Sequence, residues 1–202
     1  MDADETTLPF SRTTATLAGL MAGVREDQLA DPTPCPDWTV GDLAHHVVGL
    51  TAAFTAAARK DRSLGGRSPS AAADELPERW RERIGGQLVD LASAWEESAA
   101  YTGLTMAGPV EMPGREAGLV ALDEVVVHAW DLAAATGQPY DADPAAVELV
   151  QGFVASFEPP PGGAAEGGGL FGARVDVPED APALHRLLGL TGRDPQWAPP
   201  TR

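Results

Sequence analysis

Apolar residues recur every three or four positions along most of the chain, the spacing of amphipathic helices. The pattern predicts helices over residues 7–24, 40–59, 77–100, 115–136 and 144–157, with a short one in EDAPALHRLLGL, residues 179–190. The turn-rich stretch 102–112 predicts an extended segment or hairpin. Four long helices, an additional helix and a C-terminal tail favour an all-α fold, a four-helix bundle with long connections.

Local signals fix several of these boundaries. Thr39 with Asp42 three residues later forms a weak capping box, so the second helix is expected to begin at Val40. Pro77 suits the first turn of the third helix, and Gly137 suits the C-terminal end of the fourth.

The length of 202 residues fits one domain over 1–202. Its bundle core is expected over about residues 5–157. Residues 158–180 include EPPPGGAAEGGGLFG, a Pro/Gly-rich composition that predicts a flexible loop. Residues 181–202 are expected to form a C-terminal tail that packs on the bundle.

Charge and composition narrow the classes of function. The 30 acidic and 14 basic residues give a formal charge of -16, which repels phosphate backbones and anionic membranes. No apolar run is long enough to span a bilayer, and the acidic start MDADETTLPF does not resemble a signal peptide. These features predict a cytoplasmic protein that binds neither nucleic acid nor membrane. The abundance of Ala, Gly, Pro and Arg is typical of a high-GC bacterium.

The doublet His45–His46 lies inside the second predicted helix. At about 100° per residue, the apolar stripe faces the core, His46 lies about 80° from its centre and His45 about 180° away. His45 is therefore expected to face solvent. For His46 two interpretations remain open: a histidine at the core edge satisfied by a carbonyl or water, or a metal ligand.

Glu124 and His128 are four residues apart, so their side chains project from one side of the fourth helix. Most of this helix is apolar, and Asp131 extends the same polar stripe. One interpretation is a buried metal-binding pair with Asp131 as a supporting partner of His128. The other is an ordinary pair on the solvent side of the helix, with Asp131 a surface carboxylate.

A metal hypothesis combines His46, Glu124 and His128. Cys35 is the only cysteine, so disulfides and multi-cysteine sites are excluded, and imidazole with carboxylate favours Zn²⁺, although iron or nickel also fits. Three protein ligands leave coordination positions open, which is typical of a catalytic site. We expect Cys35 to be a small buried packing residue and His185 a surface or packing residue in the tail.

Two motifs, TPCPDWTVGDLAHHVVGL and EVVVHAWDLAAATGQP, together with the tail FGARVDVPEDAPALHRLLGLTGRDP, span nearly the whole chain. They resemble the actinobacterial DinB-like proteins related to mycothiol-dependent maleylpyruvate isomerase. The resemblance implies a DinB-like four-helix bundle that holds a divalent metal, usually zinc, on His46, Glu124 and His128. It also implies mycothiol or a related thiol as cofactor.

The resemblance further implies a metal- and thiol-dependent transferase or isomerase acting on a small electrophilic molecule. The expected partners are therefore a small-molecule thiol and that electrophile, with a homodimer as one alternative for the assembly. Maleylpyruvate isomerase has a further compact domain after its bundle, whereas only a loop and a tail follow here, so maleylpyruvate is not the expected substrate. A metal-dependent hydrolase and a non-catalytic metal-binding or interaction protein remain as alternatives.

Overall fold

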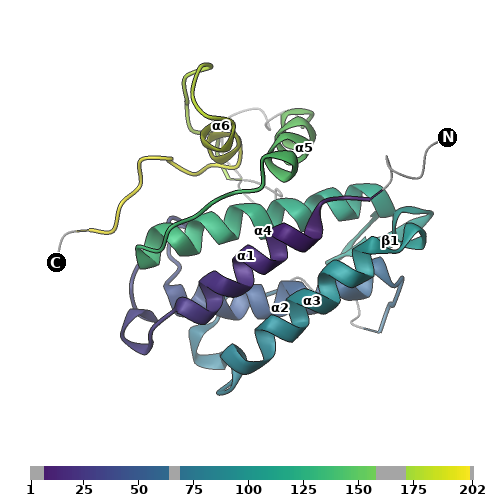
Figure 1. Cartoon of the computed structure of the whole chain (residues 1–202), viewed down its shortest axis with the longest axis horizontal. Coiled ribbons are helices and arrows are strands. Elements are labelled where there is room, and N and C mark those ends of the chain that lie inside the picture. The colour runs from purple at the N-terminus through teal and green to yellow at the C-terminus, as the bar shows by residue number, and fades with distance from the viewer. Residues whose placement is uncertain (1–6, 64–68, 158–171, 201–202) are drawn as a thin grey trace.

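Four long helices make up the body of the protein: α1 (Phe10–Gly23), α2 (Val40–Ala58), α3 (Trp80–Glu96) and α4 (Gly114–Thr136). The computed structural model describes residues 7–63, 69–157 and 172–200. α1 packs against α3 and α4, and α2 packs against the same two helices, so the four surround a common core (Figure 1). The expected all-α four-helix bundle is confirmed.

Shorter elements are arranged around this bundle. Three 3-10 turns, η2 (Glu26–Gln28), η3 (Ala73–Glu75) and η4 (Ser98–Tyr101), lie in the connections. The antiparallel hairpin of β1 (Leu104–Ala107) and β2 (Val110–Pro113) packs against one end of α2 and α4. α5 (Pro144–Ala155) lies on the outer side of α4, and α6 (Ala183–Leu190) packs on α5 (Figure 1).

All four long helices contribute fully buried side chains to the core, among them Leu17, Leu50, Leu91 and Leu122. Burying one such leucine contributes roughly 1.5–3 kcal/mol. α4 is the most deeply buried helix, since residues on nearly every side of it are covered. A polar side chain on α4 therefore needs a partner inside the protein.

The helix ends confirm most of the local signals. The Thr39 hydroxyl accepts a hydrogen bond from the Asp42 backbone amide, and the Asp42 carboxylate accepts one from the Thr39 amide, which completes the capping box. Gly137 ends α4 in the left-handed conformation with φ 70°, as the sequence predicted. The hairpin, α5 and α6 also form where they were expected, with ends shifted by a few residues.

The prediction of a single helix over 77–100 was wrong at both ends. α3 begins at Trp80, because Arg79 has a non-helical backbone, so Pro77 precedes the helix rather than lying in its first turn. At the other end Glu97 is extended, with ψ 124°, and separates α3 from η4.

Parts of the predicted organisation lie outside the described residues: the start of the core near residue 5 and most of the predicted loop, residues 158–171. Within the ranges that the structure describes, no helix is both long enough and apolar enough to cross a membrane.

Candidate metal centre

α4 places two potential ligands side by side. Glu124 and His128 are one turn apart, and the Nε2 atom of His128 lies 3.0 Å from Oε2 of Glu124. The His128 side chain is only 7% exposed and that of Glu124 is 26% exposed. This burial excludes the interpretation of an ordinary pair on the solvent side of the helix.

α2 brings His46 to the same carboxylate oxygen. Its Nε2 atom lies 3.3 Å from Oε2 of Glu124, and its ring centroid lies 4.9 Å from that of His128. His46 has its side chain 11% exposed, whereas His45 is half-buried and its Nδ1 atom faces the Ser70 carbonyl. The structure thus separates the two histidines as the helical angles predicted, but His45 is half-buried beside the Ser70 carbonyl rather than fully open to solvent.

The three residues fit a divalent cation by the chemistry and spacing of their donor atoms. Two imidazole nitrogens and a carboxylate oxygen lie within 4.8 Å of one another. Metal–ligand bonds of about 2.0–2.2 Å in a tetrahedral site separate neighbouring ligand atoms by roughly 3.3–3.6 Å. The distances of 3.0 and 3.3 Å around Glu124 are close to this separation.

Asp131 orients one of these ligands. It is fully buried, and its Oδ2 atom lies 2.9 Å from Nδ1 of His128, on the side of the ring opposite Glu124. A proton held on Nδ1 leaves Nε2 as the ligand atom, an arrangement common in metal sites. Of the two interpretations of Asp131, the surface carboxylate is wrong, because the side chain is buried against His128.

A second cluster lies behind the first and shares His128. Cys35 has its Sγ atom 3.1 Å from Oδ2 of Asp131 and 4.0 Å from Nδ1 of His128. These three side chains are close enough to bind an ion. However, the Arg193 guanidinium already lies 3.2 Å from Asp131 and 3.5 Å from the sulfur. A cation would meet this positive charge at close range, so we assign the second cluster to the support of the first.

The loop before α2 aims both Cys35 and Trp38 at this region. The Thr33 amide donates to the Trp38 carbonyl, the Trp38 amide donates to the Cys35 carbonyl, and Asp37 adopts φ 65° in the turn. The Trp38 ring then packs 4.9 Å from His46 and 6.0 Å from His128, centroid to centroid. Trp38 therefore restricts both imidazoles, and Cys35 is buried as expected but hydrogen-bonded to the site.

Hydrogen bonds connect the side chains of this cluster and shift their pKa values. Burial by itself raises the pKa of Glu124, but hydrogen bonds from His128 and His46 outweigh it and hold the pKa well below its usual range. Burial alone lowers the pKa of His128, but its contacts with Asp131, Cys35 and Glu124 raise it well above the usual value. A divalent cation held by these residues would need the ligating imidazole nitrogens deprotonated, so its binding would release protons.

Asp123 is a buried carboxyl that sequence reasoning missed. It is 6% exposed, and its Oδ1 atom has no hydrogen-bond partner in the part of the chain that the structure describes. Burial, together with the neighbouring Glu124 charge, raises the pKa of Asp123 to about 7. The available signal was an acidic residue adjoining Glu124 on a helix that is apolar over most of its circumference.

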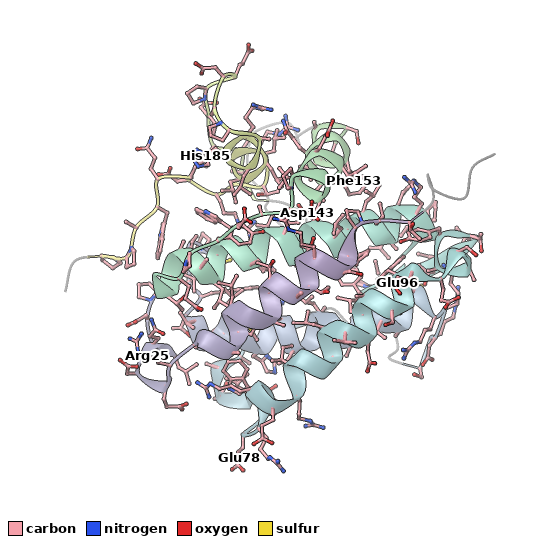
Figure 2. The ribbon with its side chains drawn as sticks, in the orientation of Figure 1. Arg25, Glu78, Glu96, Asp143, Phe153 and His185 are labelled. Carbon is pink, nitrogen blue, oxygen red and sulfur yellow. The ribbon has the colours of Figure 1, made fainter. Side chains whose placement is uncertain are left out.

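Two further residues complete the comparison with the sequence. Arg193 was not singled out, because its partners Cys35 and Asp131 lie far away in the chain. His185 lies on α6, which packs on α5 outside the bundle, and it belongs to neither cluster among the described residues (Figure 2).

Comparison with known proteins finds similar sequences and structures over most of the chain. Residues 10–133 match the family model of the mycothiol maleylpyruvate isomerase N-terminal domain. Two uncharacterized proteins of Mycobacterium tuberculosis, from strains CDC 1551 and ATCC 25618, are each 36% identical over 180 residues, covering 87% of this chain and 91% of theirs. Among solved structures, mycothiol-dependent maleylpyruvate isomerase superposes with a TM-score of 0.55 at 18% identity. A histidine-to-alanine mutant of it gives 0.56 at 16%, and each match covers 77% of this chain and 68% of that chain.

Proposed function

Since the chain belongs to the mycothiol maleylpyruvate isomerase N-terminal domain family, we propose that it binds a divalent metal, most simply Zn²⁺, through His46, Glu124 and His128. The observation that carries the proposal is the convergence of these three donor atoms from α2 and α4, with His128 oriented by Asp131. We further propose that the site serves a thiol-dependent transferase or isomerase, with mycothiol as the thiol and a small electrophile as the substrate. A bound divalent cation favours thiolate over thiol at neutral pH, which supplies a nucleophile.

The chain's own residues prepare this site in three ways. Glu124 lies between the two imidazoles, and both of their Nε2 atoms point toward its Oε2 atom. Asp131 holds a proton on Nδ1 of His128 and so presents its Nε2 lone pair. Trp38 packs against both rings and shields that side from water. The remaining exposure of Glu124 leaves the cluster accessible to a small molecule.

The test of the metal site is stoichiometry with matched variants. We expect about one divalent metal per chain in freshly purified protein and its loss in His46→Ala and His128→Ala. His45→Ala is the control, because it removes the neighbouring imidazole without touching the cluster. Metal analysis that finds no metal in the wild type, or equal loss in His45→Ala, would contradict the proposal.

The test of thiol dependence uses the same protein with and without metal. We expect mycothiol to raise the melting temperature only of the metal-loaded protein, and to do so less in His46→Ala. Hydrolysis of an ester or amide without any thiol would instead favour a metal-dependent hydrolase, in which the ion activates water. A melting temperature that falls on chelation but never responds to thiol or substrate would favour a non-catalytic binding protein.

A further inference from the structure

Asp131 is the point where three separate segments meet. Its Oδ2 atom accepts from His128 on the same helix at 2.9 Å, from Cys35 in the loop before α2 at 3.1 Å, and from Arg193 after α6 at 3.2 Å. The Nε atom of Arg193 also lies 3.4 Å from the other oxygen, Oδ1. The carboxylate is fully buried and the guanidinium is 17% exposed, so water screens this pair little.

The turn that ends α6 directs the Arg193 side chain toward Asp131 on α4. The Arg193 amide donates to the Leu188 carbonyl at 2.8 Å, and the Gly192 amide donates to the Gly189 carbonyl at 3.2 Å, the paired bonds of a Schellman motif. Gly192 has φ 86°, and a Cβ atom there would lie 2.9 Å from the Ala173 carbonyl oxygen. Glycine is therefore required at the turn that directs Arg193 toward α4. The Arg193 guanidinium also donates to the Thr191 carbonyl, which helps to hold the Arg193 side chain in this position.

We propose that Arg193 is a positioning residue for the metal centre, acting through Asp131 on the ligand His128. The C-terminal segment is then part of the site, although it contributes no metal ligand. This inference rests on the proposed metal site and adds to it a residue that is 62 positions from its carboxylate partner in the chain.

Two effects of Arg193 on metal binding have opposite signs, which makes the inference testable. As a positive charge near a cation, Arg193 disfavours the metal, so electrostatics alone predicts tighter binding after its removal. As a support of Asp131, it keeps the carboxylate aligned with the His128 ring, so its removal weakens binding. Loss of an outer partner of a metal-ligating histidine typically costs 10–100-fold in metal affinity.

The experiment measures Co²⁺ affinity by competition with a chelator, together with the Co²⁺ absorption spectrum. We expect Arg193→Gln to weaken binding about tenfold and to alter the spectrum. We expect Arg193→Lys to recover part of the loss, because an amine keeps the charge and one hydrogen bond. Arg186→Gln is the matched control: it removes one arginine from α6 whose side chain, among the described residues, donates to the nearby Glu179 and Ala181 carbonyls.

A double-mutant cycle identifies the route of the effect. If Arg193 acts through Asp131, then Arg193→Gln should change the affinity little in an Asp131→Asn background. Gly192→Ala offers a second perturbation, which keeps the guanidinium but strains the turn that delivers it. We expect it to weaken Co²⁺ binding in the same direction as Arg193→Gln.

The outcomes separate this inference from the proposed function. Absence of Co²⁺ binding by the wild type overturns the proposed function and the inference with it. Wild-type binding, with an Arg193→Gln affinity that is equal or tighter, overturns the inference alone. If Arg193→Gln does not fold, Gly192→Ala decides: an unchanged Co²⁺ affinity and spectrum in that variant overturn the inference.

Discussion

His45 and His46 are neighbours in the chain but have different surroundings. On α2, His46 lies against Glu124 and the Trp38 ring, whereas His45 faces the backbone of the segment before η3. The difference follows from the rotation of a helix by about 100° per residue. The proposed metal site therefore includes His46, and His45 supplies the control for it.

Asp42 shows how a single carboxylate couples stability to pH. The hydrogen bond from the Thr39 hydroxyl, aided by bonds from the Thr39 and Ala73 amides, lowers the pKa of Asp42 below its usual 3.8. A carboxylate with a depressed folded-state pKa stabilises the protein above its unfolded pKa, and this contribution is lost as the pH falls through the folded one.

We therefore expect Asp42→Asn to lower the free energy of unfolding by about 1 kcal/mol at neutral pH. The difference from wild type should shrink as the pH falls below about 4, where both side chains become neutral. Chemical denaturation of both proteins across this range measures it, with exposed Asp90→Asn as the control. A difference that is constant with pH would show that the cap does not depend on the ionised carboxylate.

At the scale of elements, α4 is a core helix that also carries candidate metal ligands. Its apolar residues pack against α1, α2 and α5, its polar residues Asp123, His128 and Asp131 are buried, and Glu124 is partly exposed. Such burial is costly unless the polar groups are paired. Glu124, His128 and Asp131 are paired, whereas Oδ1 of Asp123 has no hydrogen-bond partner among the described residues. The contacts of α4 therefore hold the candidate ligands Glu124 and His128 in place, which suits the proposed metal site.

The glycines at helix ends and within helices should respond oppositely to substitution. Gly137 has φ 70°, so Gly137→Ala forces a side chain into the left-handed conformation and should cost about 1 kcal/mol. Gly86 lies exposed within α3, with nothing near the position of an added Cβ, so Gly86→Ala should stabilise by about 0.5–1 kcal/mol.

Urea denaturation of the two alanine variants measures both changes, and each serves as a control for the other. Destabilisation by Gly86→Ala would contradict the expectation that alanine at this exposed position stabilises α3. A neutral effect of Gly137→Ala would mean that the end of α4 can relax out of the left-handed conformation.

At the scale of the molecule, the formal charge of -16 opposes compaction. Salt screens this repulsion, since the Debye length falls from about 30 Å at 0.01 M to about 8 Å at 0.15 M. We expect NaCl and KCl to raise the melting temperature equally over this range, by a few degrees.

A charge-reduced variant provides the control for this salt dependence. Asp74, Glu97 and Glu148 are exposed, so replacing them by the corresponding amides removes three negative charges without touching the core. The variant should show a smaller salt dependence than the wild type. A melting temperature that falls with salt would instead show that attractive ion pairs outweigh the net repulsion.

Local features of the sequence determined the helices, the capping box, the Gly137 end and the Glu124–His128 pair. Each of these depends on residues within about one helical turn, where backbone geometry alone sets which side chains are neighbours. The same geometry placed His46 at the edge of the core face. Sequence alone therefore yielded the bundle and three candidate ligands.

Only the tertiary structure decided which distant groups meet. It brought His46 to Glu124, 78 residues away, buried Asp131 against Cys35 and Arg193, and left Asp123 covered without a partner for Oδ1. These contacts depend on how α2, α4 and the segment after α6 pack, and no short-range periodicity encodes that packing. The candidate ligands could be found from spacing, whereas the residues that hold them in place required the packed fold.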